Sequence, residues 1–227
     1  MKISLIGYGK MGHAVENVAV KRGHLIVSTI DNDVEFKSKC DLLCQSDVAI
    51  EFSQPATAAD NIRRCLELGV PVVCGTTGWY DRYDELADLC RQKGGALFTA
   101  TNFSIGMNIM FALNERLAKL MIGRNDYSVS ITETHHIHKL DAPSGTAITL
   151  QQQIAENGRR SAEQVPITSY REGEVPGTHT VCYDSAIDTI TLTHEAHSRE
   201  GLAQGALMAA EWVAGKKGIF TMKDILK

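Results

Sequence analysis

Short apolar runs alternate with helical patterns along the first hundred residues of the chain. Near-continuous apolar runs predict strands at 2–7, 25–30, 47–52, 70–74 and 96–100. Between them, apolar residues recur at helical spacing over 10–22, 55–68 and 81–93, and a glycine follows each helix. The polar segment 37–45 has no such period and is expected to be an irregular connection. Strands that are apolar on both faces and alternate with helices are typical of a doubly wound parallel sheet in an α/β domain.

The pattern changes after residue 104. Apolar residues on one side of 105–121 predict a long amphipathic helix. Further helices are expected up to about 156 and over 201–214. Apolar and polar residues alternate in segments that predict half-exposed strands at 127–134, 164–170, 178–183 and 188–194. These segments predict a second α+β domain with an open mixed sheet, one face of which packs on helices or pairs with another subunit.

No linker separates the two halves, and the last helix is expected to return to the first half. The predicted domains are therefore 1–104 with 200–227, and 105–199.

Composition narrows the class of protein. The chain of 227 residues is 44% hydrophobic and 22% charged, which is too apolar for a disordered protein. A net charge of −4 gives no general attraction to nucleic acid or anionic membranes. The apolar stretches are too short to span a bilayer, and the N-terminus runs into a glycine turn, so we expect a cytoplasmic protein. The six cysteines match no zinc spacing.

A glycine motif follows the first strand and opens the first helix. Its residues are Gly7-Tyr8-Gly9-Lys10-Met11-Gly12. In this context the motif predicts a Rossmann-like dinucleotide site, with the pyrophosphate at the helix N-terminus. Asp31 ends the second strand, where an acid accepts the ribose hydroxyls of NADH. Asn32 stands where an NADPH enzyme often has arginine, but Lys10 could reach a 2′-phosphate, so both cofactors stay open.

Two later loops leave the carboxyl ends of predicted strands, where ligands of open parallel sheets bind. Gly75-Thr76-Thr77-Gly78 offers small residues and hydroxyls beside a nicotinamide ribose. Ala100-Thr101-Asn102-Phe103 offers an amide for the carboxamide of the cofactor. We therefore include both loops in the predicted cofactor site.

Proton-transfer groups gather in a polar stretch of the second half. His135, His136 and Lys139 precede Ser144-Gly145-Thr146, which starts a helix and so offers backbone donors to an anion. Hydride addition to a C=C or C=N bond builds negative charge that a nearby acid must neutralise. His135 or His136 with His138 and Asp141 could instead bind zinc, but no known ligand spacing appears, and we predict no metal.

The stretch from Glu133 to Ala147, ETHHIHKLDAPSGTA, resembles the signature loop of the 4-hydroxy-tetrahydrodipicolinate reductase (dihydrodipicolinate reductase) family. The likeness covers nearly the whole chain and includes the motifs GYGKMG, Gly75–Gly78, Thr101–Asn108, Arg171–Gly173 and Ser198-Arg199. It implies an NADH- or NADPH-dependent reduction of 4-hydroxy-tetrahydrodipicolinate in lysine and diaminopimelate biosynthesis. It also implies a homotetramer built through the sheet of the second domain.

The resemblance also implies residue roles. Lys139 would be the general acid, and His135 a proton donor or acceptor. The substrate, a small dicarboxylate, would be bound by His136, Ser144, Gly145, Thr146 and Arg199. No clear role follows for His138.

Three features depart from the family pattern. The glycine motif is one residue shorter than in many members, the segment after Gly173 is abbreviated, and Asp31-Asn32 replaces an acid–arginine pair. Two other functions share the glycine motif: an amino-acid dehydrogenase resembling aspartate dehydrogenase, and a dinucleotide-sensing module without catalysis. Turnover of a dipicolinate-type substrate separates these alternatives.

Overall fold

The computed structural model describes residues 1–226, and the chain forms two compact units. The first unit contains Met1–Ser104 and Glu200–Lys227, and the second contains Ile105–Arg199. Among the described residues, no helix is long and apolar enough to cross a membrane.

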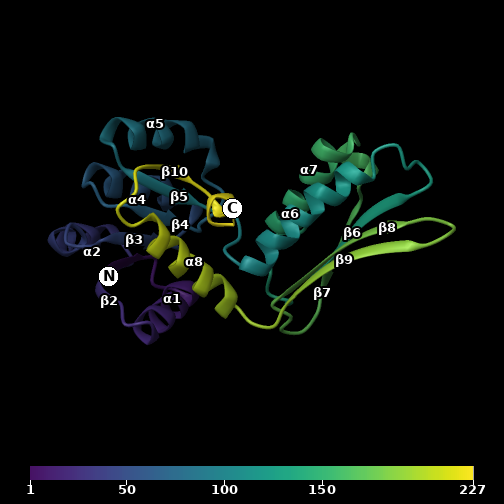
Figure 1. Cartoon of the computed structure of the whole chain (residues 1–227). Helices are drawn as coiled ribbons and strands as arrows, with labels where there is room; N and C mark the ends of the chain where they lie inside the picture. Colours follow the sequence, from purple (N-terminus) through teal and green to yellow (C-terminus); the bar gives the residue numbers. More distant parts are fainter. Residues whose placement is uncertain (227) are drawn as a thin grey trace. The chain divides into compact units, whose positions relative to one another are not determined.

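A six-stranded parallel sheet forms the centre of the first unit, in the order β10-β5-β4-β3-β1-β2 (Figure 1). Its strands are β1 (Lys2–Ile6), β2 (Leu25–Ile30), β3 (Val48–Glu51), β4 (Val72–Cys74), β5 (Ala96–Thr99) and β10 (Gly218–Phe220). The central strands β3, β4 and β5 are buried along their whole length, which explains their near-continuous apolar sequences. The predicted doubly wound sheet is therefore confirmed.

Helices cover both faces of this sheet (Figure 1). Helices α1 (Lys10–Lys21) and α8 (Glu200–Val213) pack against each other, as do α4 (Pro55–Glu67) and α5 (Tyr83–Lys93). The short elements η1 (Tyr80–Arg82) and α9 (Met222–Ile225) complete the unit. Right-handed crossovers place α1 on the face opposite α4 and α5, because the chain moves outward from β1 in opposite directions.

The prediction of an irregular connection over 37–45 is wrong. The chain there forms α2 (Asp33–Ser38) and α3 (Cys40–Leu43). Asn32 caps α2, with its side chain accepting the Glu35 N–H at 3.0 Å. Each helix has a single buried residue, Phe36 in α2 and Leu43 in α3, so neither shows an apolar period. The capping residue was the available signal.

The second unit contains a four-stranded mixed sheet in the order β7-β6-β8-β9. Its strands are β6 (Ser128–His135), β7 (Ile167–Arg171), β8 (Gly177–Asp184) and β9 (Thr189–Ala196). The β6–β7 pair is parallel and the other pairs are antiparallel, as predicted for a mixed sheet. Helices α6 (Ile105–Leu120) and α7 (Gly145–Gly158) pack together on this sheet, and η2 (Ala162–Gln164) follows α7.

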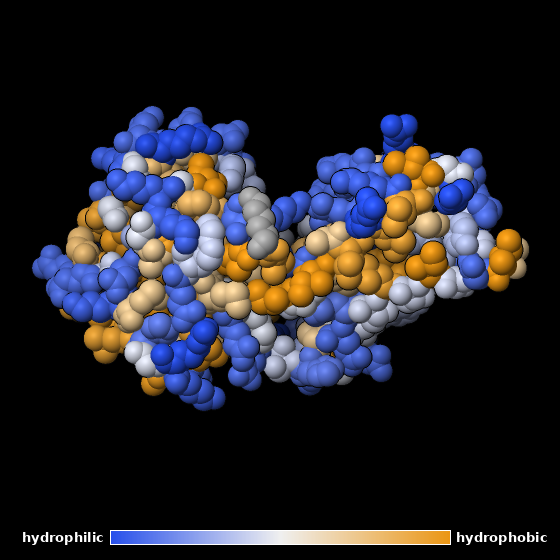
Figure 2. Space-filling view, viewed as in Figure 1, coloured by the Kyte–Doolittle hydropathy of each residue, from blue (hydrophilic) through white to orange (hydrophobic). Residues whose placement is uncertain are grey.

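Alternate residues of β6 and β8 point to the buried face of the sheet in the second unit. This face has an apolar part and a polar part. Val129, Ile131, Val181 and Tyr183 pack into the core beneath the helices. Further along the same buried face come acidic and histidine side chains. Helix α6 also has an apolar side that is exposed instead of packed in the core. Figure 2 shows hydrophobic residues along this helix, and its exposed apolar residues include Ile109, Leu113 and Leu120.

Close packing of α8 in the first unit depends on a glycine inside that helix. A Cβ at Gly205 would lie 1.8 Å from the carbonyl oxygen of Phe103. Alanine normally stabilises a helix interior relative to glycine. Here it would have to displace backbone.

We therefore expect Gly205→Ala to destabilise the protein by about 1–3 kcal/mol, the usual cost of overpacking, and to lower the melting temperature in a thermal scan. Gly201→Ala is the matched control in the same helix, because a Cβ there would meet nothing within 4 Å. An unchanged melting temperature for Gly205→Ala would contradict the packing.

Candidate active site

A cavity of about 480 Å³ lies in the first unit, at the carboxyl ends of β1, β2 and β3. The chain runs from β1 outward to β2 and returns on the other side of β1 to β3, so this is where the winding direction changes. Such switch points are where open parallel sheets bind ligands. The cavity is lined by Ile6, Gly7, Gly9, Ile30, Asp31, Asn32, Asp33, Phe52, Ser53, Gln54, Thr57 and Asn61.

The glycine motif brings backbone close to backbone beside this cavity. Gly7 has a φ of +84°, and a Cβ there would lie 2.3 Å from the Phe52 carbonyl oxygen. A Cβ at Gly12 would lie 2.5 Å from the Gly7 carbonyl oxygen. Gly9 is the N-cap of α1, where no side chain caps the helix and the first turn has no acid. This helix start therefore suits an anion.

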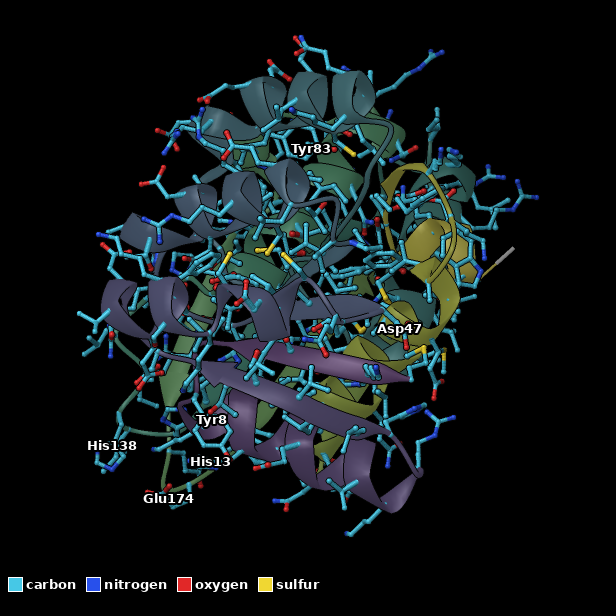
Figure 3. All side chains as sticks on the ribbon, turned by 90° about the vertical axis from the view of Figure 1, so that its left-hand side faces the viewer. Tyr8, His13, Asp47, Tyr83, His138 and Glu174 are labelled. Carbon is cyan, nitrogen blue, oxygen red and sulfur yellow. The ribbon has the colours of Figure 1, made fainter. Side chains whose placement is uncertain are left out.

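Asp31 lies beside the glycine motif, as predicted. Its Oδ1 accepts the Tyr8 N–H at 2.9 Å, and its own N–H is donated to Glu35 Oε2 at 3.0 Å. The Tyr8 ring lies next to His13, with ring centroids 4.0 Å apart (Figure 3). The Tyr8 hydroxyl donates to Glu16, and this hydrogen bond raises the pKa of Tyr8. Helix α1 begins directly after Gly9 with Lys10 and Met11, and Lys10 is exposed.

The two later loops meet the cavity through Phe52. A Cβ at Gly75 would lie 2.1 Å from the Phe52 ring, and the Phe103 ring packs edge-on against it at 5.8 Å. The Ala100 N–H is donated to the Cys74 carbonyl at 3.3 Å, which joins the starts of the two loops.

The polar residues of these loops differ in exposure. Thr76 is buried, whereas Thr77 and Thr101 are exposed. Asn102 Oδ1 accepts the Ser104 N–H at 2.8 Å. The structure thus lines the cavity itself with Gly7, Gly9 and Asp31, and brings Gly75 and Phe103 against its wall.

The residues after β3 were missed in the sequence. Phe52, Ser53, Gln54, Thr57 and Asn61 line the cavity from this side. They follow a strand, so the rule that ligands bind at the carboxyl ends of strands would have found them. Beneath them, the fully buried Glu51 accepts the N–H of Ser53 at 3.0 Å.

In the second unit, three buried titratable residues meet at the end of β6. His135 Nδ1 lies 3.5 Å from Glu133 Oε2, and His179 Nε2 lies 3.7 Å from the same oxygen. Burial lowers the pKa of His135 and lowers the pKa of His179 to about 4. For Glu133, burial alone would raise the pKa, but hydrogen bonds from Ser144 and Ser169 lower it below its usual value. The site therefore holds an ionised carboxylate beside uncharged imidazoles at neutral pH.

Lys139 lies in the loop after β6 and faces an acid. Its ammonium group donates to both carboxylate oxygens of Asp141, at 2.7 and 2.9 Å. Burial alone would raise the pKa of Asp141, but the hydrogen bond and the charge of Lys139 lower it. Arg171 holds this loop, donating to the backbone carbonyls of Lys139 at 3.2 Å and of Asp141.

His136 and Arg199, both predicted to bind substrate, lie together. An Arg199 N–H is donated to His136 Nε2 at 2.9 Å, so the imidazole accepts and is neutral. Burial, followed by the charge of Arg199, lowers the pKa of His136. His138 points away, with its side chain 72% exposed and 3.5 Å from Glu174 (Figure 3).

The predicted anion cradle is the start of α7. Ser144 is the N-cap, and its hydroxyl accepts the Ala147 N–H at 3.2 Å. The Ser144 N–H is donated to Glu133 Oε1 at 3.0 Å. The N–H and the hydroxyl of Ser144 therefore both make hydrogen bonds within the protein. At Gly145 a Cβ would meet nothing within 4 Å, so the backbone is open there. Thr146 follows and is buried.

The alternative zinc set, His135 or His136 with His138 and Asp141, is not a metal-ligand cluster among residues 1–226. Within residues 1–226, the side chains that could hold a metal are instead Glu133, His135 and His179, whose ligand atoms lie within 4.8 Å of one another. The sequence alone predicts no role for Glu133 or His179. The period-two pattern of β6 and β8 was the signal that puts them on the buried face.

Two models of one protein family match this chain. The family model "Dihydrodipicolinate reductase, N-terminus" matches residues 1–103, and "Dihydrodipicolinate reductase, C-terminus" matches residues 106–226. The 4-hydroxy-tetrahydrodipicolinate reductase of Christiangramia forsetii is 48% identical over 100% of this chain and 98% of the relative. The enzyme of the same name from Lawsonia intracellularis is 32% identical over 100% of this chain and 99% of the relative.

A solved structure agrees in fold. The dipicolinate-bound dihydrodipicolinate reductase from Paenisporosarcina sp. TG-14 matches with a TM-score of 0.82 at 22% identity, covering 99% of each chain. The family models together span nearly the whole chain, and curated relatives match it from end to end. The chain therefore belongs to the dihydrodipicolinate reductase family.

Proposed function

We propose that this chain reduces 4-hydroxy-tetrahydrodipicolinate to tetrahydrodipicolinate with NADH or NADPH, in lysine and diaminopimelate biosynthesis. The end-to-end match to a curated reductase of this name carries the proposal. The Paenisporosarcina relative binds dipicolinate, which supports a small dicarboxylate substrate for this chain as well. The clustering of His135, His136 and Lys139 before the start of α7 supports the same chemistry.

The first unit is proposed to bind the dinucleotide. Gly7 to Gly12 would hold the pyrophosphate at the start of α1, with Tyr8, Lys10 and Met11 beside it. Asp31 would accept the ribose hydroxyls. The loops Gly75–Thr77 and Ala100–Phe103 would face the nicotinamide end. When bound, the nicotinamide supplies the hydride.

The second unit is proposed to bind and protonate the substrate. Lys139 would donate the proton as general acid, and His135 would donate or accept protons beside it. The substrate carboxylates would be held by His136 and Arg199 on one side. On the other, the backbone of Gly145 and Thr146 would hold them, while Ser144 fixes the helix start.

The second unit is also proposed to build a homotetramer through its sheet. The face of the sheet opposite the helices carries small and β-branched polar residues, among them Ser130, Thr132, Thr180 and Thr193. Thr180 and Thr193 share a hydrogen bond at 3.1 Å. A surface of this kind with few charges suits sheet-to-sheet contact. A cytoplasmic location is also proposed, because the family that this chain matches consists of biosynthetic enzymes.

The reaction is tested by mixing purified protein with NADH or NADPH and freshly generated 4-hydroxy-tetrahydrodipicolinate, and following absorbance of the reduced cofactor. Oxidation dependent on the substrate is expected. A dinucleotide sensor would bind NADH without turnover, and an amino-acid dehydrogenase would turn over an amino acid instead. Oxidation of neither reduced cofactor would overturn the proposed reaction.

The role of Lys139 predicts a specific loss. Lys139→Ala should lower kcat by roughly 10²–10⁴-fold, the usual contribution of a general acid, with little change in the Kd for NADH. Lys119→Ala, which removes an exposed lysine from α6, should leave kcat unchanged. Steady-state kinetics measures kcat, and a fluorescence titration measures NADH binding. An unimpaired kcat in Lys139→Ala would remove the general-acid role.

The role of Asp31 predicts a change in cofactor preference. Asp31→Ala should weaken NADH by roughly 10- to 100-fold and NADPH much less, because only NADH presents both free ribose hydroxyls to the carboxylate. Asp31→Asn keeps an oxygen for the Tyr8 N–H while removing the charge that repels a 2′-phosphate, so it should favour NADPH. Asp41→Ala is the control, an exposed acid in α3. Equal weakening of both cofactors would place Asp31 away from the ribose.

A further inference from the structure

Strand register lines up polar side chains across the sheet of the second unit. On β6, Glu133 lies opposite Ser169 of β7 and His179 of β8. His179 in turn lies opposite His194 of β9. Because side chains directly opposite one another share a face, this is a polar row on the buried side of the sheet. Glu133 stands inside it, completely buried.

His135 occupies the next position on the same face of β6, two residues beyond Glu133. It lies opposite Arg171 of β7. A Cβ at Gly177 of β8 would lie 3.1 Å from His135 Nε2, so the glycine leaves space for the imidazole. The carboxylate, the histidine and the arginine are thus set side by side by the pairing of β6 with its neighbours.

One oxygen of Glu133 connects two parts of the candidate site. Oε1 accepts the N–H of Ser144 at 3.0 Å and the hydroxyl of Ser169 at 2.7 Å, and the guanidinium of Arg171 lies 3.5 Å away. Ser144 starts the helix proposed to hold the substrate carboxylate. Arg171 holds the backbone of the loop that carries Lys139.

The other oxygen faces the two histidines. Glu133 Oε2 is buried and has no hydrogen-bond partner, and the same is true of His135 Nδ1, 3.5 Å away. A buried carboxylate oxygen is costly without a donor, so a proton on His135 Nδ1 is favoured. His179 Nε2 lies 3.7 Å from Oε2 and 3.2 Å from the Ser144 hydroxyl. The imidazole of His179 therefore closes the network from β8.

We propose that Glu133 and His179 are positioning residues for the reduction proposed above, on which this inference rests. Glu133 holds the proton of His135 on Nδ1 and ties this histidine to the start of α7 and, through Arg171, to the loop of Lys139. His179 keeps the carboxylate and Ser144 in register. Neither residue touches the substrate; both act through the groups that do.

The charges around His135 affect its pKa, and this pKa can be used to test the network. Besides Glu133, the charged groups facing it are Lys139 and Asp141 of the loop and Arg171 of β7, and His179 faces it from β8. Burial is the largest influence on the pKa of His135 and lowers it. The carboxylate of Glu133 is the strongest influence that raises it. Removing that charge would lower the pKa of His135 further.

The test compares Glu133→Gln with wild-type enzyme. Glutamine keeps an oxygen for the Ser144 N–H but turns an amide donor, rather than an acceptor, toward His135. We expect kcat to fall by roughly 10- to 100-fold, as when the orienting partner of a functional histidine is lost. The KM for substrate and the Kd for NADH should change little. The limb of the pH–rate profile that reports His135 should move to lower pH.

Glu156→Gln is the matched control, because it removes an exposed carboxylate from α7 of the same unit. A kcat within about twofold of wild type and an unmoved pH profile in Glu133→Gln would overturn the inference. Wild-type enzyme that oxidises neither NADH nor NADPH with the substrate would overturn the reaction and this inference with it. Active wild-type enzyme with an unimpaired Glu133→Gln variant overturns the positioning role alone.

Two further measurements keep the inference testable. If Glu133→Gln does not fold, His179→Gln takes its place, and a lowered kcat with unchanged NADH binding is expected. Metal analysis of the purified protein covers the other use of these side chains. A stoichiometric ion present in wild type and lost in Glu133→Gln would make the carboxylate a metal ligand and overturn the positioning role.

Discussion

A carboxyl group buried inside each unit constrains the loops around it. Glu51 at the end of β3 and Glu133 near the end of β6 are the fully buried acids among residues 1–226. Burying a carboxylate without donors costs several kcal/mol, so each must be matched by polar groups nearby. Glu51 accepts the N–H of Ser53, and Glu133 accepts the N–H of Ser144. In both units the donor is a backbone N–H at the edge of a candidate ligand site, so the buried carboxyl group constrains where that segment can lie.

This constraint explains why the candidate sites lie where the sheets turn polar. In the second unit, Val129 and Ile131 are packed beneath α6 and α7, and the same face of β6 continues into Glu133 and His135. The apolar part supplies the burial that holds the unit together. The polar part gains its rigidity from hydrogen bonds, such as those that Glu133 Oε1 accepts from Ser144 and Ser169. Because the strand register is fixed, the packed core also fixes the positions of the side chains in the site.

Much of the fold could be predicted because it depends on local period. Apolar runs and helical spacing located most strands and helices of both halves. Helices α2 and α3 were missed because each has a single buried residue, and the short strand β10 was not predicted. Much of the candidate site could also be predicted, since His135, His136 and Lys139 are neighbours in the chain. The residues that contact them could not be predicted. His179 meets Glu133 only through the pairing of β8 with β6, and no local pattern specifies that register.

The arrangement of charge also separates three cations that look alike in the sequence. Lys139 is bound by both oxygens of Asp141, and Arg171 lies beside the ionised Glu133. Arg199 instead donates to an imidazole nitrogen of His136, whose lowered pKa keeps it uncharged. A neutral partner orients a guanidinium without cancelling its charge. Arg199 is therefore the cation best prepared to attract a carboxylate, whereas the ammonium group of Lys139 already donates to the carboxylate of Asp141.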